Sequence, residues 1–296
     1  MLNLQLPSPI QEIKGSLLDE KGVRLFIKRE DLIHPFVSGN KWRKLKYNLQ
    51  KAKEEGQDTI LSFGGAYSNH IHALAAATKA LGLKSIGIIR GEEILPLNDS
   101  LRYAKSCGME LSFVSREVYK RKTEIDFIES LREKFGDFYL IPEGGYNTEG
   151  MKGCKDIAAE IDSEYDFICC ACGTGTTISG IIASLPKGKK AIGFPVLKGG
   201  DFLYEEIKQL LSKTEKSEDN NWHLETNYHF GGYAKWNKEL VDFITDFKEK
   251  HDIQLDQVYT GKMMYGLFDL IKNDSFKEGT SIIALHTGGL QGLLKE

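Results

Sequence analysis

A lysine and three glycine-rich polar segments are the features of this sequence whose residue types could do chemistry together. Lys41 lies in the run SGNKWRK at residues 38–44, and the segments span residues 64–70, 172–177 and 286–289. A lysine amine can form a Schiff base with a carbonyl group, and backbone N–H groups of glycine-rich turns can hold a phosphate. The combination predicts an enzyme that binds a phosphorylated cofactor through Lys41. A lone lysine would more simply be one of many at the surface, and the three segments favour the catalytic role.

The segment after residue 171 has the composition of a phosphate site. It lies between an apolar run and a helical pattern, so its backbone N–H groups would add to the positive end of a helix dipole. The residues that would contact the phosphate are Gly173, Thr174, Gly175, Thr176 and Thr177. A P-loop has a lysine after its second glycine, and a dinucleotide fingerprint has a third glycine where Ile178 stands. A single phosphate is therefore favoured over a nucleotide, and a tight glycine turn without a ligand is the alternative.

Ser68, Asn69 and His70 open a helical pattern directly after a Gly-Gly turn. A helix N-terminus with a serine hydroxyl suits a substrate carboxylate, and the asparagine amide can donate to a phenolate oxygen. Ser68 can equally be an ordinary N-cap. Thr287 follows the last apolar run, where a neutral hydroxyl could face a ring nitrogen. The two glycines after it can equally form only a turn.

Two tyrosines complete the candidates. Tyr233 lies in the run GGYA, and Tyr259 directly precedes Thr260. A tyrosine near a site can stack on a planar ring or shuttle a proton. Each can instead be a half-buried aromatic residue of the core, so both interpretations stay open.

The composition is that of an ordinary globular protein. The chain has 296 residues, with 41% hydrophobic and 27% charged side chains and a net charge of −3. This charge gives no basic face, so nucleic acid and anionic membranes are not expected as partners. No apolar run approaches the roughly 20 residues of a membrane span. We therefore expect a cytoplasmic enzyme.

Five cysteines include a C-x-x-C spacing between Cys169 and Cys172. A redox pair normally opens a helix, whereas these cysteines end an apolar run. We therefore expect reduced cysteines that are buried in a strand. No second pair of cysteines or histidines has the spacing of a zinc site, and no metal is expected.

Apolar runs and helical patterns alternate along the chain. The runs that predict strands are residues 23–28, 59–63, 84–89, 110–114, 138–141, 166–170, 191–195, 257–259 and 281–285. Helices are expected at 38–55, with Ser38 as N-cap and Gly56 as stop, and at 70–81. Residues 115–134 suggest one exposed helix, and residues 212–221 a charged loop. The alternation predicts an α/β fold with mainly parallel sheets, whose ligands bind beyond the carboxyl ends of strands. Every glycine-rich segment lies at such an end.

With these motifs in this order, the chain resembles the family of 1-aminocyclopropane-1-carboxylate (ACC) deaminase and D-cysteine desulfhydrase. Members are pyridoxal-phosphate enzymes with the tryptophan synthase β-subunit fold (fold type II). The resemblance runs from IKREDL at residues 27–32 to HTGG at 286–289, and the intervals from Lys41 to Asn69 and from Tyr233 to Tyr259 match. It implies two open, mainly parallel α/β/α domains with pyridoxal 5'-phosphate in the cleft between them. The large domain would comprise residues 1–44 and 148–296, and the small one residues 45–147.

The resemblance also implies a role for each candidate residue. Lys41 would form the Schiff base with the cofactor, and Asn69 would bond the ring oxygen. The phosphate would lie on the backbone of residues 174–177, near the cation Lys44. The residues implied at the substrate, a small amino acid, are Ser68, Asn69, His70, Tyr233 and Tyr259. A homodimer is implied as well.

Thr260 and Thr287 are typical of the desulfhydrase branch. The deaminase branch usually has Glu and Leu at these positions. A carboxylate near the pyridine nitrogen would keep the ring protonated, whereas a hydroxyl leaves it closer to neutral. Opening a cyclopropane ring needs strong carbanion stabilisation, while β-elimination has a good leaving group and needs less. Two departures from the family are His72, where Arg is frequent, and a shortened region around residues 186–200.

We therefore expect a pyridoxal-phosphate-dependent lyase that converts D-cysteine to pyruvate, ammonia and hydrogen sulfide by β-elimination. Lys41 would remove the α-proton, and Tyr259 or Tyr233 would assist proton transfer. Inside the family the alternatives are ACC deaminase and another eliminase or racemase of small amino acids. Outside it, the alternative is a passive cofactor- or nucleotide-binding protein.

Overall fold

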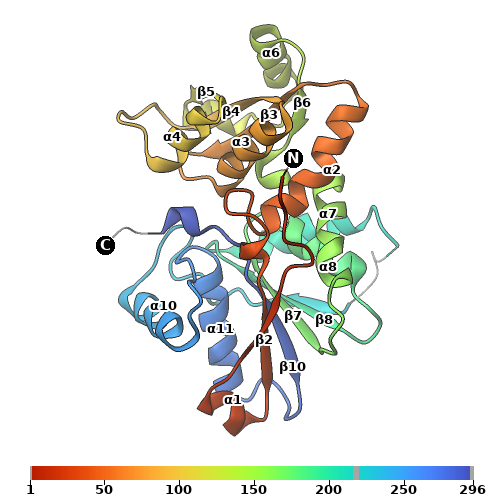
Figure 1. Cartoon of the computed structure of the whole chain (residues 1–296), viewed down its shortest axis with the longest axis vertical. Helices are drawn as coiled ribbons and strands as arrows, with labels where there is room; N and C mark the ends of the chain where they lie inside the picture. The colour runs from red at the N-terminus through yellow and green to blue at the C-terminus, as the bar shows by residue number, and fades with distance from the viewer. Residues whose placement is uncertain (1, 216–219, 294–296) are drawn as a thin grey trace.

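The computed structural model describes residues 2–215 and 220–293, in which strands and helices alternate (Figure 1). The strands are β1 (Ile10–Ile13), β2 (Arg24–Lys28), β3 (Thr59–Gly65), β4 (Lys84–Arg90), β5 (Glu110–Val114), β6 (Tyr139–Ile141), β7 (Phe167–Cys172), β8 (Lys190–Pro195), β9 (Trp222–Leu224) and β10 (Ser281–Leu285). The α-helices are α1 (Ser16–Lys21), α2 (Asn40–Glu54), α3 (Asn69–Leu81), α4 (Asp99–Ser106), α5 (Arg116–Lys120), α6 (Ile125–Phe135), α7 (Thr148–Ala159), α8 (Thr176–Ser184), α9 (Leu203–Leu211), α10 (Lys238–His251) and α11 (Thr260–Lys272). Short 3-10 helices are η1 (Glu30–Leu32), η2 (Glu143–Gly145), η3 (Gly200–Phe202) and η4 (Leu290–Gly292).

Two sheets form the framework. The larger has the strand order β1-β2-β10-β7-β8-β9, and the smaller has the order β5-β4-β3-β6. β1 pairs with β2 in antiparallel fashion, and the other neighbouring strands are parallel. The expected α/β fold with mainly parallel sheets is therefore confirmed. In Figure 1 the smaller sheet lies in the upper part of the view and the larger in the lower part. The expected boundaries at residues 44/45 and 147/148 stay a prediction.

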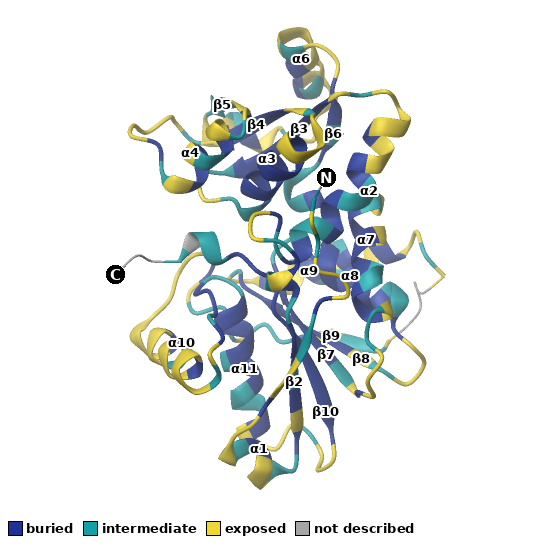
Figure 2. Cartoon of the chain, viewed as in Figure 1, coloured by how far each residue is buried: buried dark blue, intermediate teal, exposed yellow. Residues whose placement is uncertain are grey.

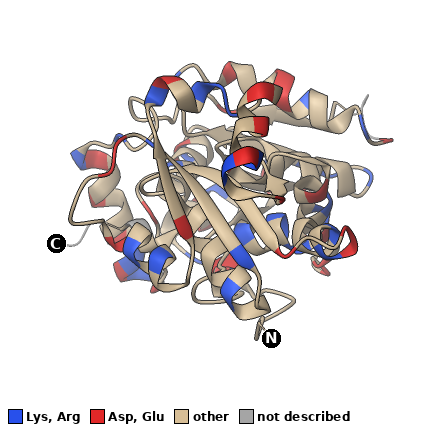
Figure 3. Cartoon of the chain, turned by 90° about the horizontal axis from the view of Figure 1, so that it is seen from above, with Lys and Arg blue, Asp and Glu red and all other residues tan. Residues whose placement is uncertain are grey.

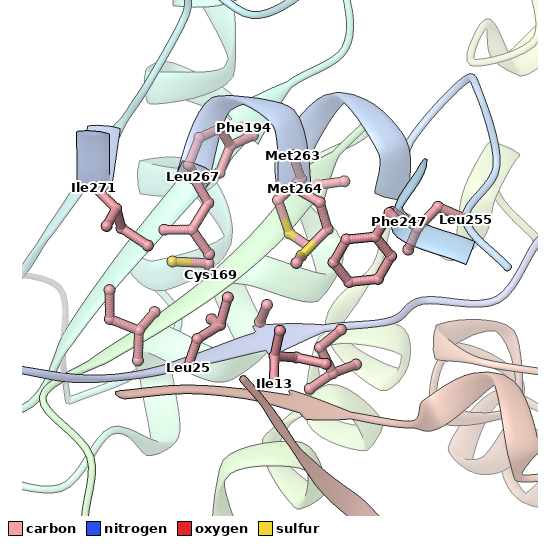
Figure 4. Close-up of a cluster of buried hydrophobic side chains, with 14 of the residues drawn as sticks. Ile13, Leu25, Cys169, Phe194, Phe247, Leu255, Met263, Met264, Leu267 and Ile271 are labelled. Atoms are coloured by element: carbon pink, nitrogen blue, oxygen red, sulfur yellow. The ribbon is translucent and has the colours of Figure 1, made fainter. Parts of the chain in front are cut away.

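The largest buried cluster joins the larger sheet to helices α10 and α11. Met263, Met264 and Leu267 of α11 face the sheet, where Leu25 and Cys169 lie (Figure 4). All residues of β10 are buried, as expected of a parallel strand that is covered on both faces. Figure 2 shows the same arrangement, with buried central strands and exposed outer faces on the helices. This cluster makes the larger sheet a rigid support for the loops at its strand ends.

Helix α2 begins one residue before Lys41. It starts at Asn40 after Gly39, which has φ +64°, so Ser38 is not its N-cap as expected. A Cβ on Gly39 would lie 1.9 Å from the Thr287 carbonyl oxygen, which explains why the chain has glycine there. The helix ends at Glu54, and Gly56 with φ +71° follows shortly after, near the expected stop.

The apolar run 257–259 is not a strand, contrary to expectation. The Asp256 carboxylate accepts the N–H groups of Val258 and Tyr259, at 2.8 and 2.7 Å, and that of Thr260 at 2.9 Å. An aspartate that accepts the following N–H groups favours a turn and a helix start. The run therefore leads into α11 instead of joining a sheet.

Three other expectations about elements are revised. Residues 115–134 form two helices, α5 and α6, because Ser115 caps the first and the chain turns before Ile125. The region is not wholly exposed, since Tyr119, Phe127 and Leu131 are buried. The short edge strands β1 and β9 were not expected from the apolar pattern. Of the expected loop at 212–221, residues 216–219 lie outside the described residues.

The cysteine prediction is confirmed. Cys169, Cys170 and Cys172 are buried free thiols of β7. Burial raises the pKa of Cys169, and a hydrogen bond with the Cys172 thiol, together with burial, raises the pKa of Cys170. Within residues 2–215 and 220–293, no three His, Cys, Asp or Glu side chains are grouped so that they could hold a metal ion. In the same part of the chain, no helix has both the length and the apolar character of a membrane crossing. Basic and acidic residues are interspersed on the face shown in Figure 3.

Candidate active site

Glycine-rich segments from both sheets line one cavity of about 380 Å³. The expected site residues that line it are Lys41, Lys44, Ser68, Asn69, His70, Gly173, Thr174, Gly175, Thr177, Tyr233, Tyr259 and Thr287. Each segment follows the carboxyl end of a parallel strand, apart from the helix turn that carries Lys41. Residues more than 200 positions apart in the sequence are thereby brought to one place.

Lys41 is half-buried in the first turn of α2. Its Nζ donates to Asn40 Oδ1, and Asn40 Nδ2 in turn donates to Thr177 Oγ1 at 2.9 Å. Burial, with the nearby charge of Lys44, lowers the pKa of Lys41 to about 7, against a weaker opposite effect of Asp256. A large share of these amines is therefore neutral near pH 7, and a neutral amine is the form that attacks a carbonyl group.

The loop between β7 and α8 has the features of an anion site. Gly175, with φ +76°, precedes α8, and no side chain caps the helix. The first backbone bond of the helix joins Ser179 N–H to Gly175 O, so the N–H groups of residues 176–178 have no earlier carbonyl partner. Lys44, which is 6% exposed, adds a buried cation to the same cavity. An uncapped helix start with a cation beside it fits a phosphorylated cofactor.

The start of α3 combines a cap with an anion site. Ser68 Oγ accepts the Ile71 N–H at 3.3 Å, so Ser68 is an N-cap, the role that the sequence left open. The N–H groups of Asn69 and His70 precede the first intrahelical bond and can donate hydrogen bonds to an anion. Gln291 Nε2 donates to Asn69 Oδ1 at 2.9 Å, which turns the Asn69 amide nitrogen toward Gly289.

His70 is a buried, neutral imidazole. Ser62 Oγ lies 2.9 Å from its Nε2 and donates its own hydrogen to Ile141 O at 2.7 Å, so Nε2 carries the proton. Burial, with the charges of Lys44 and Lys41, lowers the pKa of His70 to about 3. Its Nδ1 has no partner among the described residues. The ring is therefore an acceptor at the cavity and no general acid near pH 7.

Tyr233 and Tyr259 meet at the wall of the cavity. Their ring centroids are 6.0 Å apart at 73°, an edge-to-face pair. Burial and the neighbouring Tyr233 raise the pKa of Tyr259 well above its ordinary value. Tyr259 therefore keeps its proton near pH 7 and can donate a hydrogen bond into the cavity.

Two expected cofactor residues do not line this cavity. The Thr260 hydroxyl donates to Asp256 Oδ2 at 2.6 Å and accepts the Asp256 N–H at 2.9 Å. Both bonds lie within the turn before α11, so the hydroxyl is already paired there. Thr176 is fully buried, and its hydroxyl lies 3.0 Å from Thr174 Oγ1. Thr287 is then the hydroxyl that the loop after β10 brings to the cavity. The argument about the ring nitrogen depends on Thr287 alone.

His72 lies away from the cavity, on the inner face of α3. Its ring stacks on the Tyr103 ring, with centroids 4.3 Å apart and an interplanar angle of 19°. The Phe36 ring also stacks on Tyr103 and is tilted relative to His72. The shortened region near residues 186–200 reaches the cavity through Leu197. His72 therefore takes no part in binding a substrate carboxylate here.

The sequence interpretation missed three polar residues that line the cavity: Asn40, Arg90 and Glu143. Arg90 ends β4 and Glu143 follows β6, so the rule about carboxyl ends of parallel strands could have found both. Asn40 stands next to Lys41 and links it to the phosphate loop. Arg90 was not predicted because the end of β4 has no glycine-rich segment to mark it.

Comparisons with known proteins identify the family of this chain. The family described as pyridoxal-phosphate dependent enzyme matches residues 2–288. A putative ACC deaminase of Thermotoga maritima is 33% identical, over 98% of this chain and 96% of its own length. The bifunctional D-cysteine desulfhydrase/ACC deaminase of Arabidopsis thaliana is 32% identical, over 97% of this chain and 77% of its own. A crystal structure of an ACC deaminase homologue has a TM-score of 0.81 at 31% identity, covering 98% of this chain and 91% of that one. The chain therefore belongs to the pyridoxal-phosphate dependent enzymes, within the family of ACC deaminases and D-cysteine desulfhydrases.

Proposed function

We propose that this enzyme acts on D-cysteine and releases pyruvate, ammonia and hydrogen sulfide by β-elimination. The observation that carries the proposal is that Thr287, a residue with a hydroxyl and no carboxylate, lines the cavity in the loop after β10. Among the described residues that line the cavity, Glu143 is the only acid. It follows β6 of the smaller sheet and forms an ion pair with Lys122 at 3.5 Å. A ring nitrogen that faces a hydroxyl stays closer to neutral, which is sufficient for a substrate with a good leaving group.

The cofactor, when bound, supplies an electron sink for the pair that the α-proton leaves behind. Lys44 and the N–H groups at the start of α8 would hold its phosphate. The N–H groups of Asn69 and His70 would hold the substrate carboxylate, and the Asn69 amide would orient the ring oxygen. Asn40 keeps the Lys41 amine directed at the same cavity.

Lys41 removes the α-proton, since its lowered pKa leaves much of the amine free near pH 7. The bond from the β-carbon to sulfur then breaks, and its electron pair leaves with the sulfur. Tyr259 is protonated and lines the cavity, so it can donate a hydrogen bond to the leaving thiolate, which takes its proton from water. The remaining three-carbon fragment takes up water and is released as pyruvate and ammonia.

ACC deaminase is the second candidate. It is supported by the names of the Thermotoga maritima and Arabidopsis thaliana relatives, the latter of which carries both activities in its name. A keto-acid assay with D-cysteine, L-cysteine and ACC separates the two candidates. We expect pyruvate from D-cysteine, whereas 2-oxobutyrate from ACC without pyruvate from D-cysteine would refute the proposal.

Thr287→Val and Thr287→Ser form a matched pair for the hydroxyl argument. Valine keeps the shape of threonine without its hydroxyl, and serine keeps the hydroxyl without the methyl group. We expect elimination to fall about tenfold in the valine variant and to be largely retained in the serine variant. Equal activities would show that the hydroxyl has no role at the ring. The homodimer and the cytoplasmic location expected from the sequence stay predictions.

A further inference from the structure

Arg90 lines the active-site cavity, and its positive charge has no role in the proposed reaction. It ends β4, and its register partner in β3 is Gly65, at the turn that leads to Ser68. A Cβ on Gly65 would lie 3.5 Å from Arg90 Nη2, so the guanidinium lies beside this turn. Its Cζ is 5.6 Å from the centroid of the Tyr119 ring. The side chain is thus supported from two sides while it faces the cavity.

Arg90 is exposed at the edge of the cavity, and its guanidinium has no carboxylate partner within residues 2–215 and 220–293. Glu143 is the only acid that lines the cavity in this part of the chain, and its ion pair is with Lys122. A cation in a cavity without a protein counter-charge is well suited to an anionic ligand.

The anions of the proposed function already have other partners. The cofactor phosphate has the start of α8 and the buried cation Lys44. The substrate α-carboxylate has the N–H groups at the start of α3. Arg90 is therefore left for a further anionic group, one that extends from the substrate over the smaller sheet.

We propose that Arg90 determines specificity by binding a second anionic group on the β-substituent of the substrate. This inference rests on the proposed β-elimination and extends its substrate class from D-cysteine to small amino acids whose leaving group carries an oxyanion, as in O-phospho-D-serine. Lys41 takes the α-proton, and the bond from the β-carbon to oxygen breaks. The electron pair leaves with the oxygen as inorganic phosphate, and the remaining fragment takes up water to give pyruvate and ammonia.

Arg90→Gln and Arg90→Lys test this proposal in the holoenzyme, with Arg116→Gln as the matched control. Arg116 is an exposed arginine of α5 outside the cavity. The measurement is the ratio of kcat/KM for O-phospho-D-serine to kcat/KM for D-cysteine. We expect this ratio to fall about 10- to 100-fold in Arg90→Gln, because a charge-assisted bond to phosphate is lost. Lysine keeps the charge without the planar fork and should give an intermediate ratio. The control should keep the wild-type ratio.

A binding measurement makes the test independent of turnover. D-2-amino-3-phosphonopropionate has a carbon–phosphorus bond and cannot eliminate, so its inhibition of D-cysteine turnover reports binding. Wild type should bind it more tightly than D-alanine, and Arg90→Gln should remove that difference.

Two results would overturn the proposal. One is a wild type that neither cleaves the phosphoserine nor prefers the phosphonate to alanine. The other is an Arg90→Gln enzyme with an unchanged ratio, since Arg90 would then act on the α-carboxylate or on the fold. Failure of the proposed function looks different, because wild type would then yield no keto acid from D-cysteine.

Discussion

Gly39→Ala tests the packing between the loop before Lys41 and the loop after β10. Gly39 has φ +64° and ψ −149°, a backbone conformation that is open mainly to glycine. A Cβ at this position would lie 1.9 Å from the Thr287 carbonyl oxygen and 2.8 Å from the Gly288 nitrogen. Both are backbone atoms, so one loop must move by about 1 Å or more to restore van der Waals contact.

Gly56→Ala is the control. Gly56 has φ +71° and no atom within 4 Å of a Cβ, so alanine there meets the backbone strain without a clash. We expect it to lower the free energy of unfolding by about 1 kcal/mol. At Gly39 the backbone conformation is less accessible to alanine and the clash is added. Gly39→Ala should therefore lower the free energy of unfolding by roughly 3 kcal/mol or more.

Urea unfolding of the cofactor-free proteins measures these differences, and the absorbance of bound pyridoxal phosphate measures cofactor affinity. Because a shift of the loop also moves Lys41, we expect Gly39→Ala to lose at least about tenfold in cofactor affinity. Gly56→Ala should keep the affinity of wild type. If the two variants unfolded with the same free energy and bound the cofactor equally well, these loops would not pack on each other as described.

In cofactor-free protein, the rate at which Lys41 reacts with an amine-specific reagent should level off above its pKa of about 7, and a rate still rising at pH 9 would contradict this. His70 has a folded-state pKa of about 3, so below its ordinary value of 6.5 the unfolded chain takes up a proton that the folded chain does not. Its contribution to stability is therefore lost as pH falls from 6.5 to 3. About 3 kcal/mol of the loss between pH 6.5 and 4 should be absent in His70→Gln, as measured by urea unfolding at both values. Glu30→Gln leaves Arg43 with one carboxylate fewer at a buried site and should lower the free energy of unfolding by about 3 kcal/mol. Glu149→Gln removes the partner of Lys51 from a more exposed ion pair and should change the free energy of unfolding by less than about 1 kcal/mol.

The framework and much of the site could be predicted because both depend on local patterns. Continuous apolar runs predict buried parallel strands, and β10 is such a run. The glycine-rich segments mark the carboxyl ends of β3, β7 and β10, where parallel sheets place their ligands. Lys41 stood out because it belongs to the same set of motifs.

What could not be predicted depends on contacts between distant residues. The sequence predicted that Thr260 faces the cofactor ring, but its hydroxyl donates to Asp256 instead. This contact belongs to a turn that could not be recognised, because the apolar run 257–259 suggested a strand. Arg90 directly follows the predicted strand 84–89, but its position at the cavity depends on the pairing of β4 with β3. Local propensity is silent about such pairings, and tertiary contacts decide them.

Helix α2 explains why a lysine in its first turn can serve loops from both sheets. At its start, Arg43 donates to Glu30 Oε2 at 2.8 Å and to Glu160 Oε1 at 2.6 Å, which ties the helix to η1 and to the end of α7. Farther along, Leu45 and Leu49 pack in the cluster that contains β3 and α3 of the smaller sheet. Loss of one buried partner would leave an unpaired charge, so any shift of the helix start that separates these ion pairs is costly. Lys41 precedes Arg43 by two residues, and its amine is therefore held at the boundary where the two sets of loops meet.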